Sequence, residues 1–356
     1  MKKIAILVPD LSLGGGQRSA VSTAELLSRN NKVDIVIFSD EKRVFETDLR
    51  VRNLSCPKKD SFLGKTYNIY KRRQQFRKLC AQEKYDLVIS FLESANLCAF
   101  LSDRKNSVLT MHLSPKMLTR FDQLILRHVL SRSENIVAVS DGLKKHLGEM
   151  GHDLRNITVI NNPICAESIR AQAGENNFNN TKRFIVSAAR LTWQKGYDVM
   201  INAFRKSQAS STHDLIIIGA GEDLDSLKSM LEPDDNVYFI GEMSNPFPVI
   251  KAADMFLMTS RFEAFPMVLL ETLALEKAII AYDCPTGLTD IIENNENGVL
   301  VENHNFDELV KAIDRVTSSE IVRSELTKNC LASIEQYSFD SIESRWESYI
   351  QNHMLK

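Results

Sequence analysis

The chain of 356 residues is long enough for two domains of about 150 residues each. Its composition, 44% hydrophobic and 25% charged, excludes a disordered, collagen-like or disulfide-framed protein. With 44 Lys and Arg residues against 46 Asp and Glu residues, the net charge of −2 gives no basic field that would recruit nucleic acid.

The six cysteines include no C-x-x-C pair, which is typical of reduced thiols rather than of disulfides or zinc ligands. The apolar run at 4–9 is shorter than the core of a signal peptide, and no stretch approaches the roughly 18 apolar residues that span a bilayer. We therefore expect a cytoplasmic protein.

Short apolar runs rich in β-branched residues alternate with stretches at helical spacing. In the first half of the chain these runs are 4–9, 33–38, 86–91, 107–111, 136–139 and 157–160. In the second half they are 184–187, 215–219, 237–240, 255–259, 278–282 and 298–301. This alternation predicts an α/β protein with two doubly wound, Rossmann-like domains, each built on a parallel sheet covered by helices on both faces.

The predicted domain boundaries follow changes in composition. Residues 1–168 form the N-terminal domain, the polar, Asn-rich segment 169–182 is a linker, and residues 183–336 form the C-terminal domain. Residues 337–356 follow no further strand and predict a terminal helix that packs back on the N-terminal domain. Ligands of such sheets bind at the carboxyl ends of the strands, so site residues are expected in the loops that follow strands.

The segment 260–274 begins where one predicted strand ends. Pro266 suits the first position of a helix, and the free amides of Met267 and Val268 would then be available to an anion. Glu271 follows one turn later, and Glu263 lies in the loop before the helix. The two glutamates also fit a solvated loop acid and a surface helix residue, and spacing alone does not separate these interpretations.

Two cations, Arg190 and Lys195, flank another predicted strand-to-helix loop. A guanidinium fork and an ammonium group suit a diphosphate, and Gly196 allows the backbone to approach closely. Two ordinary surface cations are the alternative interpretation.

In the N-terminal domain, Gly14, Gly15 and Gly16 follow the first strand and precede a helix, so their backbone amides could contact a phosphate or a sugar. With Ser19 they form only a degraded dinucleotide-binding motif. His112 ends the strand 107–111, where a ligand-binding role and a structural role both remain open.

Two further loops of the C-terminal domain follow strands. Gly241 and Met243 could line a pocket for a base. Asp223 and Asp225 superficially match a metal-binding D-x-D motif, but their spacing in a helix would point the carboxylates apart. We therefore predict a charged helix face there and no metal site.

Together these motifs resemble the retaining glycosyltransferases of family 4. The resemblance spans nearly the whole chain: the N-terminal glycine loop, AVSDGLKKHL, VINNPI, ARLTWQKG, IIGAGED and above all SRFEAFPMVLLETLA. Glu263 and Glu271 stand eight residues apart, as in the family's Glu-x7-Glu signature. The resemblance implies the GT-B fold, in which two Rossmann-like domains face each other across a cleft.

The resemblance also implies roles for these residues. Arg190 and Lys195 would hold the diphosphate of a nucleotide-sugar, Glu263 would contact the donor sugar near the reacting centre, and Glu271 would bind the ribose. His112 would face the donor sugar. The remaining donor-binding candidates are Gly15, Gly16, Phe265, Met267, Val268, Gly241 and Met243. Departures at Gln17, at Ala264 and in 284–290 leave the identity of the sugar open.

The implied reaction transfers a sugar from a nucleotide-sugar, commonly a UDP-sugar, to a hydroxyl of a saccharide, with retention and without a bound metal or other cofactor. Many relatives act on lipid-linked saccharides in polysaccharide or glycan assembly. An NAD-dependent Rossmann enzyme is an alternative that leaves both cations and both glutamates unexplained. A non-catalytic protein that binds sugars or nucleotides is another.

A basic run at 65–79 contains six Lys and Arg residues and no acid, and a second run at 116–132 alternates arginines with apolar residues. Basic helices with an aromatic or aliphatic face can lie on anionic lipid. An anionic membrane surface is therefore an expected partner, at the inner face of the cytoplasmic membrane. A solvated helix that covers the sheet fits the same runs.

Overall fold

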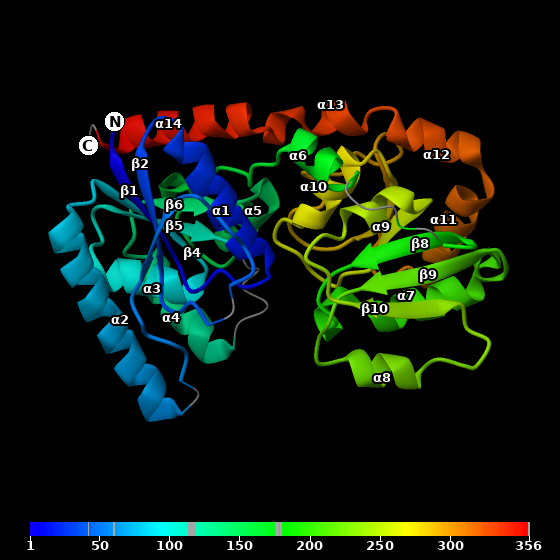
Figure 1. The fold of residues 1–356 in the computed structure, drawn as a ribbon, viewed down its shortest axis with the longest axis horizontal. Helices are drawn as coiled ribbons and strands as arrows, with labels where there is room; N and C mark the ends of the chain where they lie inside the picture. Colours follow the sequence, from blue (N-terminus) through cyan, green and yellow to red (C-terminus); the bar gives the residue numbers. More distant parts are fainter. Residues whose placement is uncertain (42, 60, 113–118, 175–177, 179, 355–356) are drawn as a thin grey trace. The chain divides into compact units, whose positions relative to one another are not determined.

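The computed structural model describes residues 1–354, except 42, 60, 113–118, 175–177 and 179. The chain forms two compact units, of which the first combines Met1–Pro163 with Phe339–Lys356 and the second spans Ile164–Ser338. Each unit contains one parallel sheet with helices on its faces (Figure 1). The predicted pair of α/β domains is therefore confirmed.

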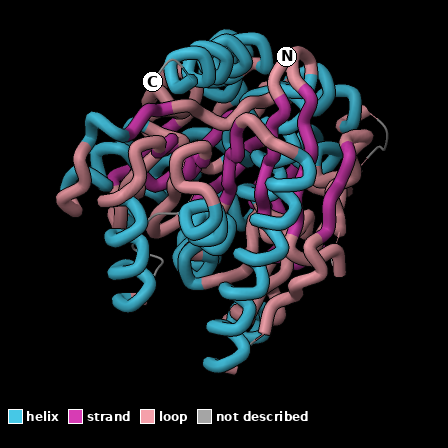
Figure 2. Tube along the Cα trace, turned by 90° about the vertical axis from the view of Figure 1, so that its left-hand side faces the viewer, coloured by secondary structure: helices cyan, strands magenta, loops and turns pink. Residues whose placement is uncertain are grey.

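The first unit has a seven-stranded sheet in the order β3-β2-β1-β4-β5-β6-β7. Its strands are β1 (Lys3–Val8), β2 (Lys32–Ile37), β3 (Arg50–Asn53), β4 (Leu87–Phe91), β5 (Ser107–Met111), β6 (Ile136–Ala138) and β7 (Ile157–Val159). Its helices are α1 (Gly15–Ser28), α2 (Phe62–Glu83), α3 (Glu93–Ser102), α4 (Arg120–Leu130), α5 (Asp141–Glu149), the 3-10 helix η2 (Leu154–Asn156) and α14 (Phe339–Met354). Figure 2 shows the strands side by side with helices on both faces, so β1 and β4 are buried along nearly their whole length.

The second unit has a six-stranded sheet in the order β10-β9-β8-β11-β12-β13. Its strands are β8 (Arg183–Ala188), β9 (His213–Ile218), β10 (Val237–Gly241), β11 (Met255–Met258), β12 (Ala278–Asp283) and β13 (Val299–Glu302). Its α-helices are α6 (Ala166–Gln172), α7 (Tyr197–Lys206), α8 (Leu224–Ser229), α9 (Phe247–Ala252), α10 (Met267–Ala274), α11 (Phe306–Ser318), α12 (Glu320–Thr327) and α13 (Cys330–Ile334). Its 3-10 helices are η3 (Trp193–Lys195), η4 (Gln208–Ser211) and η5 (Glu335–Tyr337).

The C-terminal helix α14 belongs to the first unit. Ile342, Trp346 and Ile350 are buried in the same apolar cluster as residues of α1 and β1. At the end of α1, the Arg29 guanidinium contacts the carboxylates of Asp340 at 2.7 Å and Glu343 at 3.1 Å. The amphipathic tail thus covers α1 after the chain has completed the second unit.

The compact units divide at 163/164, a few residues before the predicted boundary at 168. The segment that was predicted as a linker begins inside α6, whose Ile169 is buried. Only the Asn-rich stretch after α6 has the polar character that suggested a linker. The edge strand β3 was not predicted, because its sequence RVRN carries no apolar run.

Candidate active site

Most of the predicted donor-binding residues lie at the carboxyl edge of the second sheet. Strands β8 and β11 are parallel neighbours, with Met255 paired to Ile185, so the loops that follow them leave the sheet side by side. The loop after β8 carries Arg190 and Lys195, and the loop after β11 carries Glu263 and leads into α10.

Lys195 and Glu263 form an ion pair in which Lys195 Nζ lies 2.6 Å from Glu263 Oε1. Ser260 Oγ donates a second hydrogen bond to the same oxygen at 2.7 Å. The side chains are only 19% and 8% exposed, respectively. Glu263 is therefore no solvated loop acid and Lys195 no ordinary surface cation, because each is held in one position by a largely buried, charge-assisted contact.

Backbone contacts lock the two loops together. Gly196 has φ 68°, and a Cβ there would lie 2.1 Å from the carbonyl oxygen of Thr259. The Arg261 amide donates to the Gln194 carbonyl at 2.8 Å, and Gln194 Nε2 donates to the Phe262 carbonyl at 2.9 Å. The close approach that was predicted for Gly196 is thus to the neighbouring loop, and it sets the position of Lys195.

Arg190 stands apart from this network. Its residue is exposed, and within the part of the chain that the structure describes its guanidinium has no ion pair or side-chain hydrogen bond. This exposed guanidinium precedes the first turn of α7. An anion can bind it without first breaking a contact within the protein.

The loop after β9 packs closely against the loop that carries Arg190. A Cβ at Gly219 would lie 2.0 Å from the Ala189 carbonyl, and one at Gly221 would lie 2.1 Å from the Leu191 carbonyl. The Leu191 amide donates to the Ala220 carbonyl at 2.9 Å. Sequence reasoning missed this supporting role, although two glycines directly after a buried strand are its signal.

Helix α10 begins at Met267, with Pro266 at the N-cap rather than at the predicted first helical position. The amides of Met267 and Val268 belong to the first turn, which has no intrahelical acceptors for them. Phe265 is buried, and its ring lies 5.5 Å from that of Tyr337. Glu271 is 5% exposed and is therefore not a surface residue of the helix.

Gly241 is the last residue of β10, and Met243 lies in the loop that follows this strand. Gly241 has φ 82° with open space around the Cβ position, and its carbonyl accepts from the Gly219 amide at 2.8 Å. Asp223 precedes α8 and Asp225 lies in its first turn. Among the described residues, no group of three or more His, Cys, Asp or Glu side chains is arranged to hold a metal ion.

The remaining predicted residues lie at the carboxyl edge of the first sheet. Gly15 opens α1, and no atom lies within 4 Å of the position that a Cβ would take there. A Cβ at Gly16, in contrast, would lie 2.5 Å from Leu92 Cδ2. Gly15 thus offers an open approach to its backbone, and Gly16 is required by packing.

His112 follows β5 with its ring 5.0 Å from that of Phe91. Thr110 Oγ1 donates its proton to the Ser90 carbonyl at 2.6 Å, so it must accept in its 2.9 Å contact with His112 Nε2. Nε2 therefore carries the imidazole proton and Nδ1 is a hydrogen-bond acceptor. Burial lowers the pKa of His112 to about 3, which keeps the ring neutral.

Known proteins with similar sequences and structures cover the whole chain. The structure of Anabaena Alr3699/HepE in complex with UDP and glucose superposes with a TM-score of 0.80 at 19% identity, over 99% of this chain and 100% of that one. An N-acetylgalactosamine-N,N'-diacetylbacillosaminyl-diphospho-undecaprenol 4-alpha-N-acetylgalactosaminyltransferase of Campylobacter jejuni is 23% identical, over 91% of this chain and 92% of its own. An uncharacterized glycosyltransferase of Haemophilus influenzae is 23% identical over 98% and 100%.

Two protein-family models match in succession. Glycosyltransferase Family 4 matches residues 13–168, and Glycosyl transferases group 1 matches residues 168–331. The chain is a family 4-type glycosyltransferase with the GT-B fold. The resemblance that the motifs predicted is confirmed, and the point where the two family models meet lies close to the division between the units.

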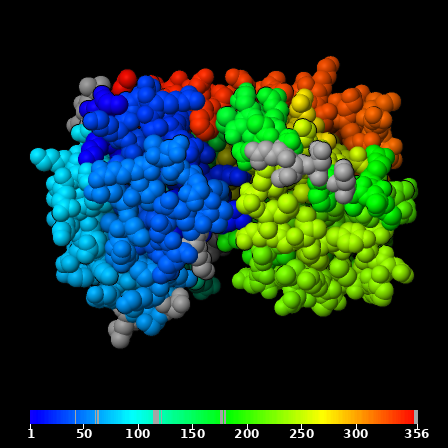
Figure 3. All heavy atoms as spheres, in the orientation of Figure 1, coloured from blue at the N-terminus to red at the C-terminus, as the bar shows by residue number. Residues whose placement is uncertain are grey.

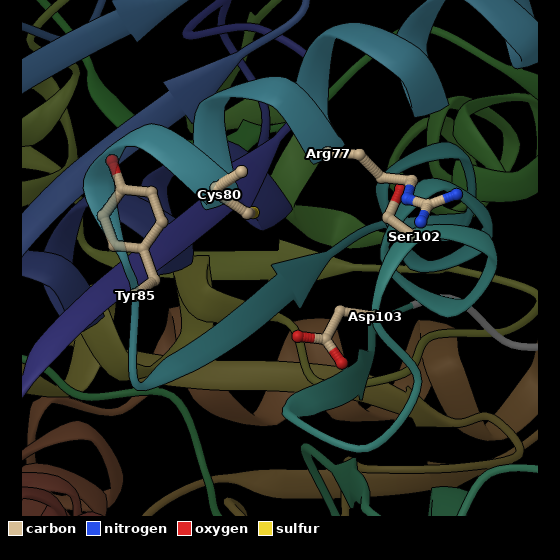
Figure 4. Close-up of a pocket in the computed structure, with 6 residues that line it drawn as sticks. Arg77, Cys80, Tyr85, Ser102 and Asp103 are labelled. Atoms are coloured by element: carbon tan, nitrogen blue, oxygen red, sulfur yellow. The ribbon is translucent and has the colours of Figure 1, made fainter.

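The glycosyltransferase has a solvent-open pocket elsewhere, of about 260 Å³, in the first unit. Figure 4 shows its walls at the ends of α2 and α3, formed by Arg77, Cys80, Tyr85, Ser102 and Asp103. Tyr85 precedes β4, so this pocket lies at the amino edge of the sheet. Burial raises the pKa of the Cys80 thiol to about 12, which leaves it without nucleophilic character.

Proposed function

We propose that the glycosyltransferase moves a sugar from a UDP-sugar, with retention and without a bound metal ion, to a hydroxyl of a lipid-linked saccharide. The observation that carries the proposal is the fixed Lys195–Glu263 ion pair, with the exposed Arg190 in the same loop as Lys195. Similarity to the Campylobacter enzyme, whose name specifies a diphospho-undecaprenol acceptor, supports the acceptor class. The likeness to a protein solved with UDP supports the donor class.

In the proposed reaction, negative charge develops at the edge of the sheet that carries Arg190 and Lys195. When the bond between the anomeric carbon and the diphosphate oxygen breaks, charge develops on the leaving nucleoside diphosphate. Arg190, Lys195 and the first amides of α10 would meet that charge most strongly as it grows, which lowers the barrier rather than only binding the substrate. In our proposal these groups take the place of a metal ion.

Lys195 and Ser260 hold Glu263 through Oε1, and our proposal does not use this carboxylate as a covalent nucleophile. We assign it instead to the donor sugar, where its negative charge would stabilise the positive anomeric centre. The acceptor oxygen would attack on the face that the diphosphate leaves, and the acceptor's proton would pass to a departing phosphate oxygen. This route retains the anomeric configuration without a second carboxylate.

The other candidates would bind rather than react. Glu271 would hold the ribose hydroxyls, and the Gly241–Met243 loop would frame the base. In the first unit, Gly15 and Gly16 would lie against the diphosphate or the acceptor. His112, neutral and protonated on Nε2, would accept a hydrogen bond from a sugar hydroxyl through Nδ1.

The described residues contain no helix long and apolar enough to cross a membrane, and we propose peripheral binding through α2. Its outward residues include Lys65, Arg77 and Lys78 together with the exposed rings of Tyr67 and Tyr70. Figure 3 shows this light-blue part of the chain on the surface of the first unit. The cations and rings would meet anionic headgroups.

Not every residue of the two basic runs contributes to that surface. Phe76 is fully buried. Arg72 stacks on Phe38 at 4.2 Å and donates to the Cys56 carbonyl at 3.0 Å. In the second run, residues 116–118 and the side chain of Phe121 lie outside what the structure describes, while Leu124 of α4 is exposed.

A screen of UDP- and GDP-sugars for nucleotide release tests the proposed donor class, and Arg190→Ala tests the site. Arg190→Ala should lower kcat and raise the donor KM, because the guanidinium acts on charge that grows in the transition state. Glu271→Ala should mainly raise KM. Lys228→Ala, an exposed lysine of α8, is the matched control and should match the wild type. A folded Arg190→Ala enzyme with unaltered kinetics would overturn the assignment.

A further inference from the structure

The loop after β12 packs backbone to backbone against the segment that carries Glu263. Cys284 and Leu288 are 3% and 0% exposed, so buried side chains fix both ends of the turn between them. A Cβ at Gly287 would lie 2.0 Å from the carbonyl oxygen of Ala264. This close approach requires glycine, and it holds the turn directly against the residue that follows Glu263.

Thr286, in the middle of this turn, reaches Glu263 itself. Its hydroxyl Oγ1 donates a hydrogen bond to the carbonyl oxygen of Glu263 and also lies 2.6 Å from the Pro285 carbonyl oxygen, so the two acceptors share one proton. The Glu263 carboxylate is held by Lys195 and Ser260. The glutamate is therefore fixed at both ends, at its carboxylate by the loops after β8 and β11 and at its backbone by the turn after β12.

The conformation of Thr286 is unfavourable for threonine. Its φ is 71°, in the left-handed region that β-branched residues rarely adopt. Glycine would fit this backbone without strain, as it does at Gly287, where φ is 89°. Strain of this kind persists where the surrounding structure over-determines it, and it gathers at functional sites. The polar group that threonine adds at this position is the hydroxyl that holds Glu263.

We propose that Thr286 is a positioning residue, whose hydroxyl fixes the backbone of Glu263 so that its carboxylate meets the donor sugar in the reactive orientation. The inference rests on the proposed function, which assigns Glu263 to that sugar. Groups that act on a transition state must be held to within about 0.5 Å, and the contacts behind them supply that precision. Thr286 acts only through Glu263, because the groups assigned to the nucleotide stand in the loops after β8 and β10 and in α10.

A purely structural turn would behave differently. If Thr286 served only to close the turn, activity would follow the stability of the fold, and glycine, which relieves the strain, would preserve it. If the hydroxyl positions Glu263, activity follows the hydroxyl instead. Thr286→Ser keeps the hydroxyl, Thr286→Val keeps the shape without the hydroxyl, and Thr286→Gly removes both the hydroxyl and the strain.

The experiment compares the wild type with these three variants and with His304→Gly as the control. His304 also has a left-handed φ, 68°, but it is exposed and lies in the loop after β13. Nucleotide release from the nucleotide-sugar that the wild type uses gives kcat and the donor KM. The affinity for UDP alone is measured by calorimetry, and the melting temperature by circular dichroism.

Thr286→Val and Thr286→Gly should each lower kcat by about 10- to 100-fold, because Glu263 is then held at its carboxylate alone. Their affinity for UDP should stay close to that of the wild type. Thr286→Gly should melt at a higher temperature than Thr286→Val, because glycine has no Cβ to strain at this φ. Thr286→Ser and His304→Gly should keep the kcat of the wild type.

Any of three results would overturn the inference. They are a kcat of Thr286→Val or Thr286→Gly equal to that of the wild type, a kcat of Thr286→Ser as low as that of Thr286→Val, and a loss of UDP affinity that accompanies the fall in kcat. A wild type that releases nucleotide from no UDP- or GDP-sugar would instead refute the proposed function, and with it the role of Glu263 that Thr286 serves.

Discussion

Removing the ammonium group of Lys195 should destabilise the second unit as well as stop transfer. In Lys195→Met, the Glu263 carboxylate, whose side chain is 8% exposed, loses the ammonium group and keeps the hydrogen bond from Ser260. Breaking a buried ion pair from one side costs about 3–5 kcal/mol, and the partial exposure of Lys195 points to the lower end. For a unit of this size, about 3 kcal/mol corresponds to a fall of roughly 6–12 °C in melting temperature.

The double variant separates stability from chemistry. Adding Glu263→Gln to Lys195→Met removes the uncompensated charge while keeping a hydrogen-bond acceptor for Ser260. We expect it to recover about 2 kcal/mol of the lost stability, as the coupling in a double-mutant cycle. Transfer should not return, because both charges that act on the donor are gone.

The assay is urea unfolding followed by circular dichroism, with kcat measured on the same samples. Lys311→Met is the matched control, because the Lys311–Glu308 pair has nearly the same length, 2.7 Å, but side chains 70% and 54% exposed. Loss of so exposed a pair should leave the free energy of unfolding close to that of the wild type. Equal stability losses for Lys195→Met and Lys311→Met would refute the reasoning, as would a double variant no more stable than Lys195→Met.

Three further predictions concern other parts of the molecule. Gly196→Ala should lower the free energy of unfolding by more than about 1 kcal/mol, because its φ is 68° and a Cβ would lie 2.1 Å from the Thr259 carbonyl oxygen. An unchanged urea unfolding curve would contradict this. Burial raises the pKa of Glu93 to about 7 in the folded protein, against an ordinary value of 4.5, so its ionisation destabilises the fold as the pH rises from about 4.5 to 7. Glu93→Gln should therefore stabilise the protein by about 2 kcal/mol at pH 8 and by little at pH 4.5. Thermal melts at both pH values check this. The protein should float with phosphatidylglycerol vesicles at low salt and sediment at high salt, and failure to float at low salt would count against α2 as a membrane surface.

The fold was largely predictable because buried parallel strands leave a plain signal. β1, β4 and β8 are buried along most of their length, and each contains an apolar run. The signal fails where burial is incomplete. β3 lies at a sheet edge, with exposed or half-buried residues throughout, and α6 is too short and polar to separate from a linker by composition.

The candidate site was predictable as a set of residues but not as a network. The spacing of Glu263 and Glu271 indicated the family, yet nothing in the sequence showed that Glu263 pairs with Lys195, because the partners are 68 residues apart. Nor does the sequence show the left-handed φ of 73° at Leu92, or the Glu93 Oε1 that has no hydrogen-bond partner among the described residues. Both arise from how α1, β4 and α3 pack, and such tertiary features appear only when the chain is folded.

The most direct test of the account is the configuration of the product. The first UDP-sugar that supports transfer is supplied in excess EDTA, and the coupling constant of the product's anomeric proton is followed by NMR from the earliest time points. The account predicts transfer without added metal and an anomeric configuration equal to that of the donor. An inverted product, or transfer that occurs only after magnesium or manganese is restored, would contradict it.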